Sequence, residues 1–387
     1  MKSTKQERIN VLGVGINATS PEDAVSRLLE ARRRGERGYV CVTSVHGVME
    51  SQCDPELRCI HNNSLMTVPD GMPTVWMGQE YGFTEMRRVY GPDLMLAVCE
   101  QSVENGPSGL VESRSKSLKD GAAPLVESRS KGSLKVVEGR LKSLNGEDGP
   151  QTTDNRQQAT GNKSFTHFLY GATAEKLAKL KANLEEWCPG ILIAGTYAPP
   201  FRPLSDEEER ELQSIVAECK PDFFWVGLST PKQERFMAEH GATPLVEDGP
   251  SGLVENRSKS LKTVENGALP LVENGSKSLK GVGRRLKALN GKHGPQVKYP
   301  LDVGIMIGVG AAFDIHSGMM KDAPQWIKNA GLQWFYRLCC EPRRLWRRYL
   351  WIVPGFLWLA FLQVMGLRRW EIDGPAGLVK NGADAHR

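Results

Sequence analysis

The stretch RINVLGVGINATSPEDAVSRLLEARRRGERGYVCVTSV, residues 8–45, decides the class of fold that the sequence predicts. Arg8–Ile16 is an apolar run with strand character, and Tyr39–Val45 is a second run rich in β-branched residues. Between them, Ala24–Arg34 has the composition of a helix, and Ser20 is placed to cap its start, followed by a proline at the first helical position. We therefore expect a strand, a helix and a second strand in succession.

The same alternation continues along the rest of the chain. Strands are expected at Thr166–Tyr170, Ile191–Gly195, Phe223–Gly227 and Val303–Ile307, and helices at Ala174–Trp187, Asp206–Cys219 and Lys232–His240. Alternating strands and helices are typical of a mostly parallel sheet with helices on both faces. The predicted fold class is therefore α/β, with a Rossmann-like core.

Composition and charge exclude several classes of protein. The chain has 387 residues, 40% of them hydrophobic, which is enough for one large domain or two ordinary ones. The formal charge of +5 is mild, and no base-reading basic helix or zinc-finger spacing occurs, so nucleic acid is not an expected partner. None of the eight cysteines forms a C-x-x-C pair, which favours reduced thiols. The first sixteen residues lack the apolar core of a signal peptide, so we expect a cytoplasmic location.

Two segments, at about 105–165 and 246–298, interrupt the α/β pattern. GPSGLVESRSKSLK (106–119) returns as SGLVENRSKSLK (251–262), and both segments are rich in Gly, Ser, Lys and Glu. Such segments bury too little apolar area to offset the entropy of ordering, so we interpret them as flexible insertions. A solenoid is the alternative for repeats, but these copies are few and irregular. The tail 371–387 carries a fragment of the repeat and is also expected to be flexible.

The C-terminal segment 335–370 differs from the core, 1–334, in its density of arginine. Between positions 337 and 370 there are seven arginines and one acidic residue. Arg337, Arg344 and Arg347 differ by seven and three positions, so we expect them to share one helix face. Three guanidinium groups on one face suit a diphosphate. A solvated basic face is the alternative.

The same segment contains the uncharged apolar run Trp351–Leu367, which Pro354-Gly355 interrupts. The run is short for crossing a bilayer, and tryptophans flank it, which favours a helix that lies in the membrane interface. A buried core helix is the alternative. We expect a helical, membrane-associating appendage.

Ligands of open parallel sheets bind beyond the carboxyl ends of the strands. The candidate phosphate contacts in loops expected at that edge are Gly195, Thr196, Gly308 and Gly310. Tight turns are the alternative for each loop. The run GVGAAF is not a full G-x-G-x-x-G, so it does not indicate a dinucleotide cofactor. No Asp-x-Asp pair occurs in the chain, so we expect no metal at the site.

Asp70 is the candidate catalytic residue. It lies in Val68–Met72 (VPDGM), where proline and glycine favour a rigid turn that presents one carboxylate. A carboxylate in a cleft acts as a general base toward a sugar hydroxyl. Thr43 and His46 close an earlier strand and are candidates to face the same cleft. The alternatives are a turn-forming aspartate and a packed core histidine.

With these residues together, the chain resembles the WecG/TagA/CpsF glycosyltransferase family (family 26). The matching stretches occur in the family's order and are YVCVTSVHGVMES, TVPDGMPTVWMG, VYGPDLMLAVCE, HFLYGAT, GTYAPPF, VGLSTPKQERFM, IGVGAAFDIHSG, KDAPQWI, GLQWFYRL and EPRRLWRRYL. The resemblance implies inverting transfer of an N-acetylmannosamine-type sugar from a UDP donor to a polyprenyl-diphosphate-linked acceptor. It also implies a place in bacterial surface-polymer or exopolysaccharide synthesis, at the inner face of the cell membrane, with self-association possible. The UDP-sugar is a substrate, and no cofactor is expected.

The resemblance also implies roles for individual residues. Asp70 matches the family's proposed general base, and Thr43 lies in the segment that lines the same pocket. Gln233 and Asp314 match positions expected near the UDP donor. The arginines expected to bind the acceptor diphosphate are Arg337, Arg344 and Arg347. One departure concerns donor specificity, because Ser44-Val45-His46 stands where many members have an asparagine.

Two other functions stay open on the sequence alone. An inactive relative could serve as a membrane-surface scaffold that displays the repeats, although Asp70, Gln233 and the arginines argue against it. A nucleotide-sugar epimerase or dehydrogenase is disfavoured by the incomplete glycine motif and by the lack of a Tyr-x-x-x-Lys pair.

Overall fold

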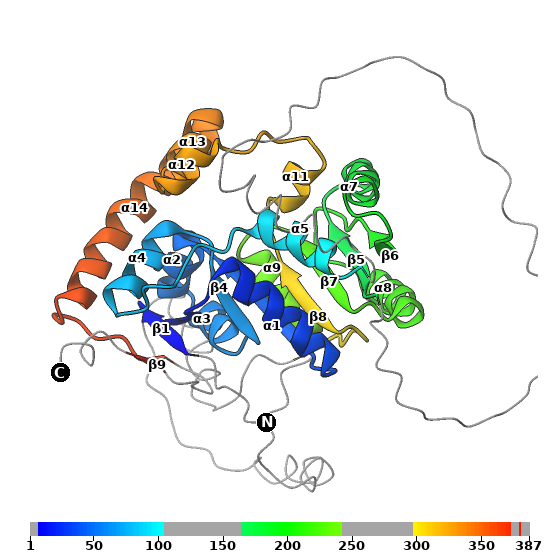
Figure 1. The fold of residues 1–387 in the computed structure, drawn as a ribbon, viewed down its shortest axis with the longest axis horizontal. Coiled ribbons are helices and arrows are strands. Elements are labelled where there is room, and N and C mark those ends of the chain that lie inside the picture. The colour runs from blue at the N-terminus through cyan, green and yellow to red at the C-terminus, as the bar shows by residue number, and fades with distance from the viewer. Residues whose placement is uncertain (1–6, 104–163, 242–296, 373–378, 381–387) are drawn as a thin grey trace, which may run out of the picture.

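The computed structural model describes residues 7–103, 164–241, 297–372 and 379–380. The two predicted insertions and the predicted flexible tail lie almost entirely outside these ranges. The described residues form a parallel sheet covered by helices, a small antiparallel hairpin beside it, and a group of C-terminal helices (Figure 1).

The six-stranded sheet has the order β4-β3-β8-β7-β5-β6, and every neighbouring pair of strands is parallel. Its strands are β3 (Gly38–Thr43), β4 (Met66–Pro69), β5 (Thr166–Gly171), β6 (Leu192–Tyr197), β7 (Phe223–Gly227) and β8 (Ile305–Gly308). The predicted parallel α/β core is confirmed. Since all carboxyl ends lie at one edge, the loops that follow the central strands meet there.

Helices cover both faces of the sheet because its central strands are apolar on both sides. Along β3, Val40 packs into one core cluster and Tyr39 into the other, as the alternation of a strand requires. The first face carries α1 (Pro21–Arg33), α5 (Gly91–Gln101), α7 (Ala174–Trp187) and α11 (Ala312–His316). The second carries α3 (Pro55–Asn62), α8 (Asp206–Cys219) and α9 (Lys232–His240).

The predicted start of the first helix is confirmed. The Ser20 side chain accepts a hydrogen bond from the Asp23 backbone at 3.2 Å, and Pro21 occupies the first helical position. Two further helices, α2 (Val45–Cys53) and α4 (Met72–Glu80), begin directly after β3 and β4. The candidate residues of the first half of the chain, Thr43, His46 and Asp70, lie at or beside the junctions between these strands and helices.

The prediction of a single strand over Arg8–Ile16 was wrong. The segment forms the antiparallel pair β1 (Arg8–Val11) and β2 (Val14–Asn17), which belongs to a separate small sheet with β9 (Val379–Lys380). Leu12 and Gly13 form the turn with φ of +51° and +84°, the left-handed values of a tight hairpin. Leu12 tolerates this conformation because it is fully buried and its backbone N–H donates to Gln363 Oε1 at 2.9 Å.

The C-terminal helices are α12 (Gln325–Asn329), α13 (Gln333–Cys340) and α14 (Pro342–Val364). The predicted interruption at Pro354-Gly355 is absent, because α14 continues through both residues. In Figure 1, α14 runs along one flank of the molecule beside α2, α4 and the hairpin. Ile352 and Phe356 are 6% and 3% exposed, so one face of α14 belongs to the core. In the described ranges, no helix has both the length and the apolar character that crossing a membrane requires.

Candidate active site

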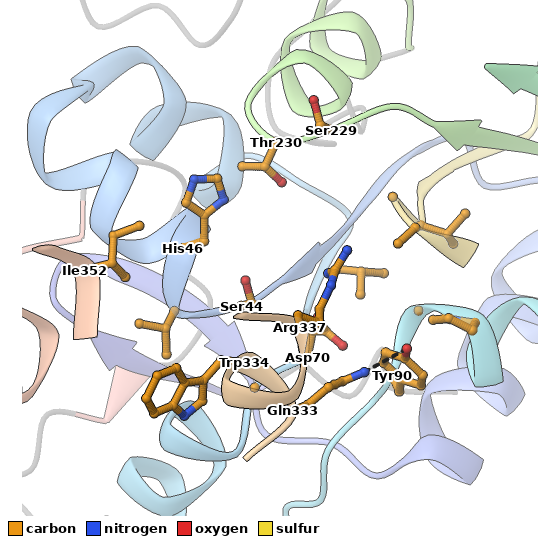
Figure 2. A pocket seen from close by; sticks show the side chains of 18 of the residues that line it. Ser44, His46, Asp70, Tyr90, Ser229, Thr230, Gln333, Trp334, Arg337 and Ile352 are labelled. Atoms are coloured by element: carbon orange, nitrogen blue, oxygen red, sulfur yellow. Dashed lines mark hydrogen bonds between the residues drawn. The ribbon is translucent and has the colours of Figure 1, made fainter. Parts of the chain in front are cut away.

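A cavity of about 570 Å³ lies at the carboxyl ends of β3, β4, β7 and β8. Much of its wall comes from the loops that follow these strands and from the facing sides of α13 and α14, and segment 88–92, Lys176 of α7 and Asp314 of α11 also contribute. Figure 2 shows side chains from the strand-end loops and from these two helices pointing into the same space, with Asp70 among them.

Asp70 is placed by the end of β4. Its backbone N–H donates to the Thr43 carbonyl at 3.0 Å, which extends the ladder between β3 and β4, and Gly71 is the N-cap of α4. The carboxylate lines the cavity and its side chain is 27% exposed. The rigid turn predicted from the sequence thus presents this carboxylate to a space that a substrate can enter.

Arg88 joins the carboxylate to the C-terminal helices, a role that the sequence interpretation missed. Its Nη2 lies 3.5 Å from Asp70 Oδ1, and its Nε donates to the Asp70 carbonyl. The same guanidinium donates to Gln333 Oε1 on α13 and lies over the Tyr90 ring, 4.3 Å from its centroid. The signal was present in the stretch MRRVYGPDL, where an arginine and a tyrosine stand near the start of a helix.

Tyr90 is a second residue that connects the Asp70 loop to α13. Gln333 Nε2 donates to the Tyr90 hydroxyl at 2.8 Å, and that hydroxyl donates to Asp322 Oδ1 at 2.9 Å. Burial, followed by the nearby Asp322 carboxylate, raises the pKa of Tyr90, so the phenol stays protonated and can keep donating. The start of α13 is therefore tied to the loop that holds Asp70.

Gln233 holds together the loops on the other side of the cavity. Its side chain is buried, Oε1 accepts from the Gly310 backbone at 3.1 Å, and Nε2 donates to Glu234 Oε1 at 3.0 Å. Glu234 Oε1 also accepts from the Thr230 hydroxyl at 2.9 Å. Burial raises the pKa of Glu234. The loop after β7 and the loop after β8 are thus fixed relative to each other.

An ion pair between Lys176 of α7 and Asp314 of α11 forms the edge of the cavity beyond these loops. Ser229 and Thr230 contribute hydroxyl groups to the same region. Backbone amides, hydroxyls and a lysine at the carboxyl edge of a parallel sheet are groups that bind nucleotide phosphates.

The opposite wall is apolar and cationic. Ile352 and Phe356 of α14 face the cavity together with Arg337 of α13 and Arg348 of α14. His46 of α2 lies in this region, with Nε2 3.3 Å from Glu50 Oε1. Burial, and then the positive charge of Arg348, lower the pKa of His46, which favours the neutral imidazole.

The structure brings together half of the residues predicted from the sequence. Those that line the cavity are His46, Asp70, Gln233, Gly310, Asp314 and Arg337. Thr43 and Gly308 lie behind the wall: Thr43 is 1% exposed, and a Cβ on Gly308 would lie 3.1 Å from the Gln233 side chain. These two residues support the wall and do not line it.

The prediction that Gly195 and Thr196 lie in a strand-end loop at the site was wrong. Both lie within β6, which runs on to Tyr197 at the edge of the sheet, with β5 and β7 between it and β8. The glycine is needed for packing, because a Cβ at this position would lie 2.5 Å from the Phe168 ring.

The shared helical face of Arg337, Arg344 and Arg347 was also predicted wrongly. The helix ends at Cys340, and Pro342 begins a new one, so Arg337 belongs to α13 and the other two to α14. Arg347 is exposed and does not line the cavity. The Arg344 side chain lies outside the described part of the structure.

No group of three or more His, Cys, Asp and Glu side chains that could hold a metal ion occurs in the described ranges. That the site needs no metal and no cofactor stays a prediction.

Comparison with known proteins gives one family and a consistent set of relatives. The family described as Glycosyl transferase WecG/TagA/CpsF family matches residues 9–140, 142–246 and 295–370. Two relatives share the name N-acetylglucosaminyldiphosphoundecaprenol N-acetyl-beta-D-mannosaminyltransferase. The one from Bacillus subtilis (strain 168) is 25% identical to the chain over 183 residues, and the one from Bacillus spizizenii is 24% identical over 183 residues. Each match covers 47% of this chain and 47% of the relative, so the chain spans about half the length of these relatives.

Proposed function

This chain belongs to the WecG/TagA/CpsF family of glycosyl transferases, and from that premise we propose that it is an inverting glycosyltransferase. The donor is a UDP-linked sugar of the N-acetylmannosamine type, and the acceptor is a sugar carried on a polyprenyl diphosphate. Both relatives are named for transfer of N-acetylmannosamine to an N-acetylglucosaminyl diphosphoundecaprenol. The product would enter a bacterial surface polymer or exopolysaccharide.

The observation that carries the proposal is the division of the cavity around Asp70. On one side are the loops after β7 and β8, with hydroxyls, backbone amides and Lys176, which suit a nucleotide diphosphate. On the other side are Arg337 and the apolar residues of α14, which suit a diphosphate with an isoprenoid chain. A carboxylate between these two regions lies where the acceptor hydroxyl would meet the donor sugar, and it is placed to take the proton of that hydroxyl.

In the proposed reaction, an Asp70 carboxylate oxygen takes the proton of the acceptor hydroxyl. The hydroxyl oxygen forms a bond to the anomeric carbon from the face opposite the leaving group. The bond from that carbon to the phosphate oxygen breaks, and UDP leaves with the electron pair. The amides and hydroxyls of the β7 and β8 loops, held by Gln233, stabilise the charge on the departing diphosphate. Attack from the opposite face inverts the anomeric configuration.

Replacement of Asp70 by asparagine tests this role. The amide keeps the shape of the side chain but cannot accept the proton, so kcat should fall about 10²- to 10⁴-fold while UDP affinity is kept. The assay combines UDP-N-acetylmannosamine with a lipid-linked N-acetylglucosamine and measures released UDP and the disaccharide lipid. Asp302→Asn, at a half-exposed carboxylate that does not line the cavity, is the matched control. Near-normal turnover by Asp70→Asn would refute the general-base assignment, and wild-type protein that forms no disaccharide would refute the function.

We also propose that α14 rests on the inner surface of the cell membrane. Its outward face exposes large apolar side chains, with Trp351 79% and Trp358 61% exposed, beside arginines at both ends. Indoles favour the headgroup zone, and each near-surface arginine adds about 1 kcal/mol of attraction to anionic lipid. The double variant Trp351→Ser/Trp358→Ser should bind anionic vesicles several-fold more weakly in co-sedimentation. Unchanged co-sedimentation would mean that another surface carries the contact.

A further inference from the structure

Glu234 is a buried carboxyl group of α9 that lies directly behind the cavity wall. The residue is 1% exposed and does not itself line the cavity. Two residues that do line it, Thr230 and Gln233, donate hydrogen bonds to the same carboxyl oxygen, Oε1, at 2.9 and 3.0 Å. An effect of Glu234 on a bound substrate would therefore pass through these two partners.

The amide of Gln233 has one orientation that satisfies both of its neighbours. The Gly310 N–H can only donate, so it requires Oε1 of Gln233, which lies 3.1 Å away. The Nε2 of Gln233 then needs an acceptor on its other side, and Glu234 Oε1 supplies it. Without an acceptor at position 234, this buried amide nitrogen would lack a partner, and the amide could turn and release Gly310.

The hydrogen bonds that Glu234 accepts do not require a negative charge. In the described ranges no basic side chain lies within ion-pair distance of its carboxyl group, and the adjacent Arg235 pairs with Asp54 and Glu56 instead. Burial is the main cause of the raised pKa of Glu234, which favours the neutral acid. A neutral carboxyl group still accepts both bonds at its carbonyl oxygen. Unlike a carboxylate, it does not repel a diphosphate bound on the other side of the wall.

We propose that Glu234 is a positioning residue of the donor site, which through the amide of Gln233 holds the loops after β7 and β8 in the geometry that binds a nucleoside diphosphate. The identity of the donor rests on the proposed function, but UDP binding can be measured without any transfer reaction. The two carboxyl groups of the site then have opposite requirements. An amide at position 70 removes the role of Asp70, whereas an amide at position 234 preserves that of Glu234.

Three variants of the full chain, titrated with UDP by calorimetry, test this role. Glu234→Gln keeps an accepting oxygen and should bind UDP within about threefold of the wild type, whereas Glu234→Met removes the acceptor and should bind it about 10- to 100-fold more weakly. Glu209→Met is the matched control, because Glu209 is another buried carboxyl group, hydrogen-bonded to His240 at 2.9 Å, and does not line the cavity. It should lower the free energy of unfolding but leave UDP affinity unchanged.

Three results of these titrations would overturn the proposal. They are normal UDP binding by Glu234→Met, an equal loss of affinity in Glu209→Met, and a loss in Glu234→Gln as large as that in Glu234→Met. Glu234→Asp withdraws the carboxyl group by one methylene and should also lose UDP affinity, so it takes the place of Glu234→Met if that variant does not fold.

A double variant tests whether Glu234 acts through Gln233. In a Gln233→Ala background, Glu234→Met should weaken UDP binding no further, because the residue that transmits its effect is already gone. Additive losses would show that Glu234 acts on the site by another route and would contradict the proposal.

Kinetics then divide the effect between the two substrates. Glu234→Met should lower kcat/KM for the UDP-sugar by about tenfold or more and leave KM for the lipid-linked acceptor unchanged. A rise in the acceptor KM as well would indicate a general disturbance of the cavity and count against the proposal. If the wild type binds UDP but forms no disaccharide, the proposed function fails, and the UDP titrations still decide the role of Glu234. A wild type that does not bind UDP would overturn both.

Discussion

His167 is a fully buried residue whose ring connects β5, β7 and the end of α5. Trp225 Nε1–H donates a hydrogen bond to His167 Nδ1 at 3.0 Å, because an indole nitrogen can only donate. The proton of the neutral imidazole is therefore on Nε2, which donates to Ser102 Oγ at 2.7 Å. Burial lowers the pKa of His167 to about 4, against about 6.5 for an exposed imidazole. The imidazole of His167 is therefore neutral in the folded protein, and protonation of Nδ1 would break the hydrogen bond from Trp225.

This shift predicts a loss of stability in acid. The unfolded histidine takes up a proton near pH 6.5 and the folded one only near pH 4. The contribution of the neutral His167 to the free energy of unfolding is therefore full above about pH 6.5 and is lost as the pH falls toward 4. Between pH 7.5 and 5 the loss is on the order of 2 kcal/mol. Urea unfolding at both pH values measures it.

The variant His167→Gln provides the comparison. It should be less stable than the wild type at pH 7.5, because it disturbs two buried hydrogen bonds, but its free energy of unfolding should fall less between pH 7.5 and 5. His61, whose pKa burial also lowers to about 4, remains in both proteins and cancels. Parallel pH profiles for the two proteins would contradict the prediction.

At this scale, the sequence could identify Asp70 because its neighbours specify a turn after a strand. It selected Arg347, whereas Arg348 is the one of the two that lines the cavity. This difference depends on the phase of α14, which Pro342 at its start and the burial of Ile352 and Phe356 decide. Nor could it find Arg88, because its partners Asp70 and Gln333 are brought to it by tertiary packing.

Among the elements, α14 has two faces with different roles. Phe356 is 3% exposed and packs with the hairpin and α2, whereas Phe361 on the same helix is 50% exposed. The inner face is therefore part of the fold, and the outer face is available for contact with a surface. The C-terminal segment predicted as an appendage is thus helical, and one face of α14 packs against the core.

Alanine at each phenylalanine tests this division with a matched pair. Phe356→Ala should lower the free energy of unfolding by about 3–5 kcal/mol, because it leaves a cavity in the core. Phe361→Ala should change it by less than about 1 kcal/mol. Urea denaturation measures both, and vesicle binding should show the reverse order. Similar destabilisation by both substitutions would mean that the outer face of α14 also contributes to the core.

The elements that the sequence predicted well are those with a clear period and a recognisable cap. The bounds expected for α7, α8 and α9 are those observed, since their apolar spacing is regular and Thr173 and Ser205 cap the first two. The hairpin was missed because its turn is Leu-Gly and not one of the usual Asn-Gly or Asp-Gly pairs. Leu12 accepts a left-handed conformation through packing and a bond to Gln363, a residue more than 350 positions away.

In the whole molecule, the described ends of the two long gaps in the structure lie close together. Phe165 N–H donates to the Ser102 carbonyl at 3.1 Å, and Lys298 N–H donates to the Glu239 carbonyl at 2.8 Å. The first pair lies just before β5, at the amino end of the sheet, whereas the candidate active site lies at the carboxyl end. A strand of six residues separates the two edges by about 20 Å. Each gap can therefore be closed by a short turn without moving the site.

This arrangement predicts that residues 104–163 and 242–296 can both be replaced by short Gly-Ser turns. The shortened protein should fold and catalyse the same transfer with a kcat within about twofold of the full chain, because no residue assigned to the site is removed. Its stability should rise slightly, since each halving of a flexible loop lowers the closure cost by about 0.6 kcal/mol. Circular dichroism, thermal unfolding and the UDP-release assay are the measurements, with single replacements of each segment as controls. A shortened protein that unfolds would show that the replaced segments support the fold, and one that folds but has lost transfer would show that they take part in the reaction.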